Sequence, residues 1–434
     1  MVMSDPIFSP DGQFMWTGSE WIPAPPTSSQ SANVNLKDSV IGGDVNITQN
    51  NVVDITNAMV QALDRLGFSG QSSPAELTLA QEHEVEQVLE LSEKIADYGI
   101  EIDPETELTL GNAAQSTGRT HSAQQHFLRA LKTSRKNGDR NYETISLLSL
   151  GSIAKTQGDL AEAERLYRGA LTISKEIGDS RLRSFGEKIT LSHLGNIART
   201  RGDFAEAERL FRECLAICIE IGDRIGEESS LISLGDIAEM RGDLAEAERL
   251  YRESLTICKE IGVRSGERRS LSFLGDIART RGDLAEAERL YRGALTISKE
   301  IGNRRAEANS LTSLGNIAEM RGDLAEAERL YRESMAISRE VDDRSGEAIS
   351  LRSLGRLAQE RGNTAEAERL FREVLAIYRE IGDRSAEADS LILLGDIASL
   401  NGNMDERHRF YTEGVRIQRE IGIPIQQWFI DNGY

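Results

Sequence analysis

Several residue types are scarce in this sequence, and each scarcity excludes a class of protein. Three cysteines in 434 residues are too few for a disulfide framework. No apolar run approaches the length of a membrane-spanning helix, and the first residues lack the apolar core of a signal peptide. Basic residues are outnumbered by acidic ones, 51 to 71, giving a net charge of −20. This charge argues against nucleic acid and anionic membranes as main partners. We therefore expect a cytoplasmic protein with reduced thiols.

Glycine, in contrast, is frequent and recurs at a fixed period. One phrase, of the form GDIA..RGDLAEAERLYR, returns along most of the chain. Its leading glycine stands at Gly111, Gly151, Gly195, Gly235, Gly275, Gly315, Gly355 and Gly395, so that the spacing is 40 residues except for one of 44. A fixed period of this length indicates a solenoid, in which each unit buries its apolar face only against its neighbours.

Each repeat contains two amphipathic stretches with the spacing of helices. The second stretch starts at Asp243, which with Glu246 forms a capping-box pattern, and stops at Gly262. We predict two helices of about four turns each, joined by an Arg-Gly-Asp turn. The glycine makes this turn and the aspartate caps the second helix, so the tripeptide is not an adhesion ligand. We expect the extra four residues of the 44-residue unit to lie in a loop within 179–188.

The repeat resembles the tetratricopeptide repeat. The residues that carry the resemblance are Leu234-Gly235, Ala247, Tyr251 and Ser254, which fall at that family's signature spacing. Eight copies cover about 105–422. The longer unit and its link at 343–347 look more like the repeats of Pins-type adaptors and kinesin light chains, although the signature Trp and Pro are absent. The resemblance implies an all-α, right-handed superhelix (an α-solenoid) of eight helix pairs, whose concave face binds a peptide or a segment of a partner protein.

The segments outside the repeats have two interpretations each. Residues 1–26 contain the string SPDGQFMWTGSEWIP, which resembles a short Trp-rich motif of prokaryotic proteins. This segment forms either a self-packing β-hairpin or a site for a proline-rich or hydrophobic ligand. Residues 27–53 form a linker followed by a β-hairpin, with self-association through 33–53, or a disordered tether. Residues 54–103 are two N-terminal capping helices, the second opened by Ser73-Pro74, or an autoinhibitory segment. Residues 104–422 are the repeats. Residues 423–434 are an apolar tail around 428–430 that seals the last repeat or is presented to a partner.

No arrangement of residues indicates an enzyme, a cofactor or a metal. The sequence has no Gly-rich phosphate loop and no HExxH, and its five histidines are scattered. Cys214 and Cys218 share a helical face, but two thiols without a matching pair make a poor zinc site, and they are better interpreted as small packing residues. We expect a non-catalytic protein.

The candidate site follows from the resemblance and consists of first-helix residues that face the groove. The residues after the repeat glycines are Asn112, Ser152, Asn196, Asp236, Asp276, Asn316, Arg356 and Asp396, and the positions one turn on or beside them add Lys155, Arg199, Glu239, Met240, Arg279, Glu319 and Met320. In the Pins-like relatives an Asn after the glycine clamps peptide backbone, and only three of the eight positions hold Asn here. The alternating charges at 199, 239, 279 and 319 either pair with one another or read a ligand. The predicted function is an interaction scaffold. The alternative is a regulatory sensor with output through the N-terminal hairpins.

Overall fold

The computed structural model describes residues 14–16, 21–23, 32–36, 43–47, 52–68, 77–97 and 99–434. The chain divides into two compact units, 1–217 and 218–434, each of which is described by itself. In the N-terminal region the backbone forms two antiparallel strand pairs: β1 (Phe14–Trp16) with β2 (Trp21–Pro23), and β3 (Ala32–Leu36) with β4 (Gly43–Ile47). The predicted 27–53 segment ends earlier than expected, because Val52 already begins a helix.

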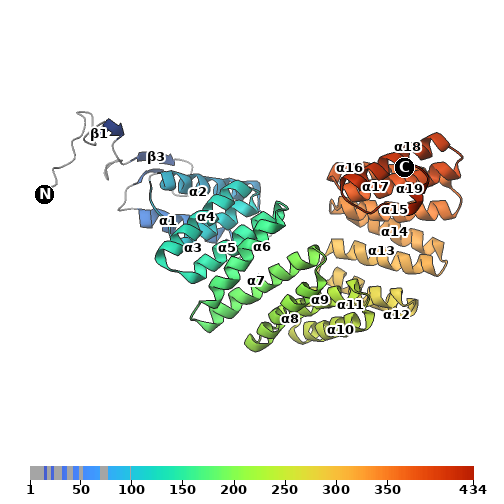
Figure 1. The fold of residues 1–434 in the computed structure, drawn as a ribbon, viewed down its shortest axis with the longest axis horizontal. Coiled ribbons are helices and arrows are strands. Elements are labelled where there is room, and N and C mark those ends of the chain that lie inside the picture. Colours follow the sequence, from blue (N-terminus) through green and yellow to red (C-terminus); the bar gives the residue numbers. More distant parts are fainter. Residues whose placement is uncertain are drawn as a thin grey trace. The chain divides into compact units, whose positions relative to one another are not determined.

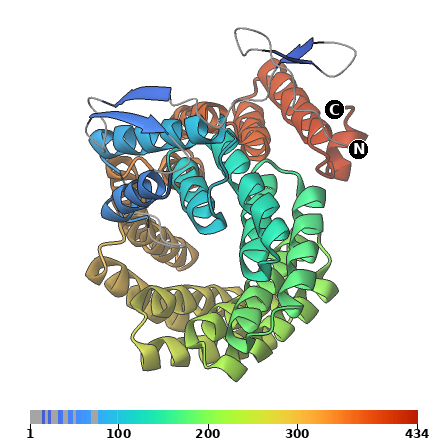
Figure 2. The same cartoon turned by 90° about the vertical axis from the view of Figure 1, so that its left-hand side faces the viewer.

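The rest of the described chain is an all-α solenoid of paired helices (Figures 1 and 2). Unit 1 holds α1 (Val52–Arg65), α2 (Leu79–Asp97), α3 (Pro104–Ser116), α4 (Thr120–Asn137), α5 (Arg140–Thr156), α6 (Leu160–Lys175) and α7 (Ser180–Thr200), and the boundary falls within α8 (Phe204–Ile221). Unit 2 holds α9 (Arg224–Met240), α10 (Leu244–Ile261), α11 (Arg264–Thr280), α12 (Leu284–Glu300), α13 (Arg304–Met320), α14 (Leu324–Glu340), α15 (Arg344–Glu360), α16 (Thr364–Ile381), α17 (Arg384–Leu400), α18 (Met404–Glu420) and α19 (Gln427–Asp431).

The Arg-Gly-Asp turns end the first helix and begin the second. Between α11 and α12, Gly282 has a φ of 80°, a conformation that glycine adopts without steric cost. The Asp283 side chain then accepts a hydrogen bond from the backbone N–H of Glu286 at 3.0 Å. The predicted capping box is only half formed, because the Asp283 N–H donates to Ala278 O and the Glu286 carboxylate binds Arg289 instead.

The repeat glycine allows the two helices of a pair to pack closely. A Cβ added at Gly275 would lie 2.6 Å from Cε1 of Tyr291, a distance that real Cβ atoms do not show. The aromatic ring therefore lies directly against the backbone of the first helix, and Tyr291 is almost completely buried. Equivalent glycine–aromatic contacts occur in every repeat, which explains why the glycine recurs.

The four extra residues of the 44-residue unit lie in a helix, and the predicted loop is wrong. After the N-cap at Asp179, α7 runs for 21 residues, whereas the equivalent α11 has 17. Four residues add about one turn at 3.6 residues per turn. An insertion of this length keeps the packing face of α7 in register with its neighbours, so it lengthens the helix without disrupting the pair.

In several repeats, an arginine in the inter-helix turn connects the repeat to the preceding one. Arg281 pairs with Glu248, 33 residues earlier in α10, and donates to the Leu244 carbonyl at 3.0 Å. In the first repeat, Arg119 stands two positions further along the turn, at the N-cap of α4, and pairs with Glu86 of α2. An ion pair thus links the second N-terminal helix to the turn of the first repeat.

The N-terminal helix pair buries an apolar face. The predicted packing residues of α1, among them Ile55, Met59 and Leu63, are buried, as are Val88 and Ile95 of α2. The predicted helix start at 73–74 lies outside the described residues, and α2 begins at Leu79.

At the other end of the chain, Phe429 and Tyr434 pack on Tyr411 and Val415. Trp428 and Ile430, which we expected to share this role, are each about half exposed. Among the described residues, none of the helices combines the length and the apolar character needed to cross a bilayer.

Candidate functional site on the first helices

The predicted site residues all lie on first helices, at the repeat glycine plus one and plus four or five. The residue after the glycine is half-buried in every repeat except at Arg356, which is exposed. One turn on, Arg199, Glu239, Arg279 and Glu319 are also half-buried, whereas Lys155, Met240 and Met320 are exposed. These positions therefore form two polar rows that reach the surface along the first helices of each unit.

In unit 2, tyrosine hydroxyls from the second helices hold these polar residues. Tyr291 donates to Asp276 at 2.7 Å and Tyr411 to Asp396 at 2.6 Å. Tyr331 lies within hydrogen-bonding distance of Asn316 at 2.6 Å and of Glu319 at 2.7 Å. The tyrosine stands 15 residues after the first acceptor and 12 after the second. Sequence reasoning missed these contacts, although the constant spacing between tyrosine and acceptor is visible in the sequence.

The same packing leaves several of these carboxylates poorly solvated. Burial raises the pKa of Asp396, although the Tyr411 hydroxyl opposes the shift. Burial likewise raises the pKa of Asp276 and of Glu239. A cation brought near these oxygens would favour their charged form.

The charges of unit 2 are partly paired among themselves, in a pattern that differs from the predicted alternation. Arg279 lies 3.7 Å from Asp276 of its own helix. Glu319 pairs at 2.6 Å with Arg356 of the following first helix, so Arg279 is not its partner. Such half-exposed pairs contribute at most about 1 kcal/mol each and can exchange partners.

Unit 1 presents a different set of groups on its first helices. Asn196 donates to the Ser192 carbonyl at 2.9 Å, and Arg199 donates to the Asn196 side chain at 3.2 Å. At the two positions that lie one and four residues after each repeat glycine, unit 1 carries two cations and no acid, whereas unit 2 carries five carboxylates and two arginines. The first-helix residues of the two units thus differ in the sign of their charge.

Unit 2 also has pockets beside its second helices, which sequence reasoning did not anticipate. One, of about 490 Å³, lies between α10 and α12 and has Leu274 and Ile277 of α11 among its lining residues. Two more, of about 570 and 590 Å³, occupy the equivalent positions one and two repeats further on. Their rims hold ion pairs such as Arg252 with Glu248. The predicted site residues do not line these three pockets.

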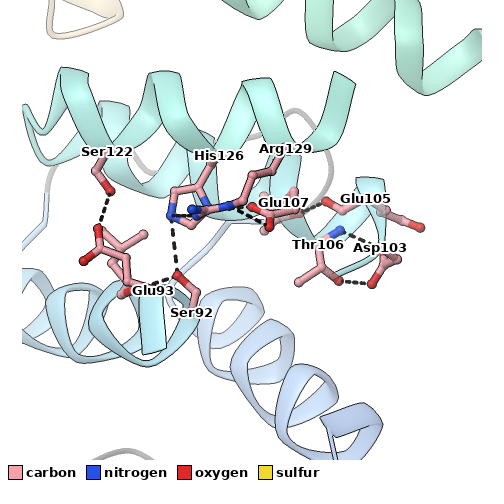
Figure 3. A network of polar contacts seen from close by, with 11 residues as sticks. Ser92, Glu93, Asp103, Glu105, Thr106, Glu107, Ser122, His126 and Arg129 are labelled. Carbon is pink, nitrogen blue, oxygen red and sulfur yellow. Dashed lines mark hydrogen bonds and ion pairs between the residues drawn. The ribbon is translucent and has the colours of Figure 1, made fainter. Parts of the chain in front are cut away.

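A buried polar network occupies the first repeat (Figure 3). Glu107 Oε2 lies 2.6 Å from His126 Nδ1, and Arg129 Nε donates to Glu107 Oε1 at 2.9 Å. Ser92 of α2 lies 3.5 Å from the other ring nitrogen of His126. Both Glu107 and His126 stand where the later repeats carry apolar side chains, mostly leucine, a substitution that the sequence shows and that we had not singled out.

Potential ligands for a metal do not gather in the structure. Within the described ranges, no group of three or more His, Cys, Asp or Glu side chains is arranged to hold an ion. Cys214, Cys218 and Cys258 are buried as free thiols. Burial raises the pKa of Cys258 to about 11, with the neighbouring Glu228 charge acting in the same direction, so this thiol is protonated at neutral pH.

Comparison with known proteins identifies the family. The tetratricopeptide repeat family matches residues 104–176, 188–260, 267–340, 308–380 and 346–420, which together cover more than half of the chain. The chain belongs to the tetratricopeptide repeat family. The match consists of repeats and includes no catalytic domain. The finer resemblance to Pins-type and kinesin-light-chain repeats stays a prediction, and no curated protein matches the sequence.

Solved structures share the fold of this repeat protein at low sequence identity. The apo quorum sensor NprR from B. thuringiensis is 13% identical, with a TM-score of 0.58 over 85% of this chain and 99% of that one. A signal transduction ATPase with a tetratricopeptide repeat sensor from Pyrococcus horikoshii is 16% identical, with a TM-score of 0.54 over 80% of this chain and 54% of that one. A Rap protein complexed with Competence and Sporulation Factor is 12% identical, with a TM-score of 0.51 over 86% and 99%.

Proposed function

We propose that this tetratricopeptide repeat protein is a non-catalytic scaffold that binds a peptide or segment of a partner protein along its first helices. The observation that carries the proposal is the polar row beside the repeat glycines. Its side chains are half-buried and, in unit 2, are oriented by tyrosine hydroxyls from the second helices. Polar groups held in position before a ligand arrives lose little conformational entropy on binding.

The proposed contacts differ in character between the units. In unit 1, Asn196 and Arg199 offer amide and guanidinium donors, and in unit 2, Glu239 and Asp276 offer acceptors. Exposed Met240 and Met320 beside them provide adaptable apolar contacts. The concave groove, the right-handed winding and the cytoplasmic location that the sequence predicts belong to this proposal.

The related structures support a binding role. They are a quorum sensor, a signal transduction ATPase with a tetratricopeptide repeat sensor, and a Rap protein complexed with Competence and Sporulation Factor. Each of these proteins presents the same fold with a TM-score above 0.5.

A direct test compares two faces of the protein with a partner obtained by affinity capture. Asn196→Ala/Arg199→Ala removes donors from the first-helix face, and Arg252→Ala/Lys259→Ala alters the rim of the second-helix pocket. We expect the first pair of substitutions to lower the affinity for the partner at least about tenfold, which corresponds to the loss of one or two charge-assisted hydrogen bonds. We expect the second pair to leave the affinity unchanged. The reverse pattern, in variants whose circular dichroism is unaltered, would move the site to the second helices.

The second candidate is a regulatory sensor whose output passes through the N-terminal hairpins. Two of the related structures, a quorum sensor and an ATPase with a tetratricopeptide repeat sensor, favour it. Deletion of residues 1–53 should then abolish the cellular output and leave partner binding intact. Sedimentation of the same deletion and of the full chain tests whether residues 33–53 mediate self-association. Loss of partner binding on deletion would contradict the sensor proposal.

A further inference from the structure

We propose that unit 2 binds an extended, cationic segment of the partner whose apolar side chains are spaced to match every second repeat. This inference rests on the proposed function and names the chemistry of the partner at the same first helices. Its basis is a set of exposed apolar side chains, Met240, Met320 and Leu400, which we call the apolar row.

The apolar row lies at the ends of alternate first helices. Its members are the last residues of α9, α13 and α17, and each side chain is more than half exposed. The first helices between them end in polar residues, Thr280 of α11 and Glu360 of α15. The equivalent residues of unit 1 all carry hydroxyl groups: Ser116, Thr156 and Thr200. A single exposed apolar side chain is ordinary, whereas three at a fixed interval indicate a contact surface.

Each member of the apolar row stands one helical turn after a residue of the polar row beside the repeat glycines. Met240 follows Asp236 by four residues, and Leu400 follows Asp396 by four. Residues at this interval lie on the same face of a helix. The apolar row and the polar row therefore face the same side of the first helices, where one ligand can contact both.

The carboxylates beside Met240 indicate the charge of the occupant. Burial raises the pKa of Glu239, and the negative charges of Asp276 and Asp236 act in the same direction. Arg279 offsets part of this repulsion, since it lies 3.7 Å from Asp276. A cation placed among these oxygens would favour their charged forms, whereas an anion would add to the repulsion. Charge complementarity thus requires lysine or arginine side chains in the segment that covers the apolar row.

The interval of two repeats sets the spacing of the apolar side chains in this segment. First helices of consecutive repeats, such as α13 and α15, are in contact. Packed helices lie about 8–10 Å apart, so alternate first helices lie about 16–20 Å apart. An extended chain rises about 3.3 Å per residue and covers this distance in about six residues, an even number that returns the side chain to the same side. The residues between then carry the cations past the carboxylates.

The test measures the binding of synthetic peptides to the full-length protein by fluorescence anisotropy. The basic probe has leucine at every sixth residue, lysine at the intervening positions that point to the same side, and serine elsewhere. A neutral probe carries glutamine in place of lysine, and an acidic probe carries glutamate. We expect the basic probe to bind saturably and at least about tenfold more tightly than the neutral one, with an affinity that falls as salt is added. Equal or tighter binding of the acidic probe, or no saturable binding of the basic probe, would overturn the proposal.

Substitutions in the apolar row test the apolar contacts. Met240→Ser and Met320→Ser should each lower the affinity for the basic probe about fivefold and keep the fold, because both side chains are exposed. Ile225→Ser is the matched control, because Ile225 is comparably exposed at the other end of α9. It should bind the basic probe as the unmodified protein does. Equal weakening by Ile225→Ser would mean non-specific apolar attraction and would refute the surface.

A second pair of variants tests the charge. Glu239→Gln/Asp276→Asn removes two carboxylates, and the asparagine is the residue that α13 carries at the equivalent position. This variant should lower the affinity for the basic probe about tenfold and leave the neutral probe unchanged. Glu253→Gln/Glu333→Gln removes the same charge from exposed positions on the second helices and should change neither. An equal loss in both variants would show attraction to the net charge of the protein and would contradict the proposal.

The captured partner separates this proposal from the scaffold proposal. If Asn196→Ala/Arg199→Ala weakens the partner while the basic probe does not bind, the scaffold stands and the surface on unit 2 is wrong. If the basic probe binds as predicted while the first-helix variants of both units leave partner affinity unchanged, the scaffold proposal fails for that partner and the surface stands.

Discussion

A matched pair of tyrosine substitutions gives opposite predictions for two structurally equivalent residues. Tyr331→Phe removes a hydroxyl that lies 2.6 Å from Asn316 and 2.7 Å from Glu319. Tyr167→Phe removes a hydroxyl that has no hydrogen-bond partner in the described part of the chain. Both rings are fully buried against a repeat glycine, so the change in apolar packing is the same in the two variants. The difference between them therefore reports the hydroxyl alone.

The expected magnitudes follow from hydrogen-bond energetics. The Tyr331 hydroxyl has one proton, so its loss removes one strong hydrogen bond and leaves half-buried acceptors without a donor. We expect Tyr331→Phe to lower the free energy of unfolding by about 1–2 kcal/mol. For Tyr167→Phe, the removed hydroxyl had paid a desolvation cost without a compensating bond. We expect unchanged stability or a gain of up to about 1 kcal/mol.

Local measurements suit this experiment, because a repeat array unfolds in parts rather than as one cooperative unit. Hydrogen exchange followed by mass spectrometry should show faster exchange in α13 and α14 for Tyr331→Phe and no acceleration in α5 and α6 for Tyr167→Phe. Urea unfolding gives the accompanying global values. Destabilisation of the same size in both variants would show that the Tyr167 hydroxyl has a hydrogen-bond partner and would refute this reasoning.

Three further predictions concern stability. Arg281→Ala should lower the free energy of unfolding by about 1 kcal/mol and speed hydrogen exchange where two repeats meet, because the side chain contacts the preceding second helix. Arg289→Ala should lower it less, because the ion pair of Arg289 stays within one helix. Burial raises the pKa of Asp396, so the folded protein keeps this proton to higher pH than the unfolded chain does. The free energy of unfolding should therefore fall as the pH rises through the pKa of the folded state. Asp396→Asn should raise the free energy of unfolding at pH 7 and, in urea unfolding, make it depend less on pH above about pH 4. Glu107→Leu alone should destabilise by about 3 kcal/mol in urea unfolding because it leaves His126 without its carboxylate, and adding His126→Leu should recover that loss.

The sequence predicted most of the repeat architecture, because the same local signals occur eight times. Helix limits follow from the glycine of the turn and the aspartate that caps the second helix, as between Gly282 and Asp283. The need for a small residue at Gly275 could also be inferred, since two helices that pack on an aromatic ring leave no room for a Cβ. Each of these features depends on residues within one helical hairpin.

The errors have a different physical origin. The sequence analysis places the insertion near Asp179 in a loop because insertions are least costly there, but four residues match the helical period and extend α7 without moving its packing face. The contact of Tyr331 with Asn316 joins two helices, and its spacing carries no signal of amphipathicity. Site chemistry of this kind depends on which side chains meet across a hairpin, which periodicity does not specify.

Departures from the repeat pattern are therefore the most informative positions in the chain. Where Asp276 faces Tyr291, the repeat satisfies its own hydroxyl and has no local need for a ligand. Where Ser152 and Lys155 stand before Tyr167, the carboxylate and amide oxygens of the other repeats are replaced by a hydroxyl and an ammonium group. A repeat protein that used all its hairpins only for packing would gain stability by placing phenylalanine at residue 167, as it has at residues 127, 211 and 371. Tyr167 is therefore the position at which the aromatic packing of the repeat is kept while the hydrogen bond that accompanies it elsewhere is missing from the described part of the chain.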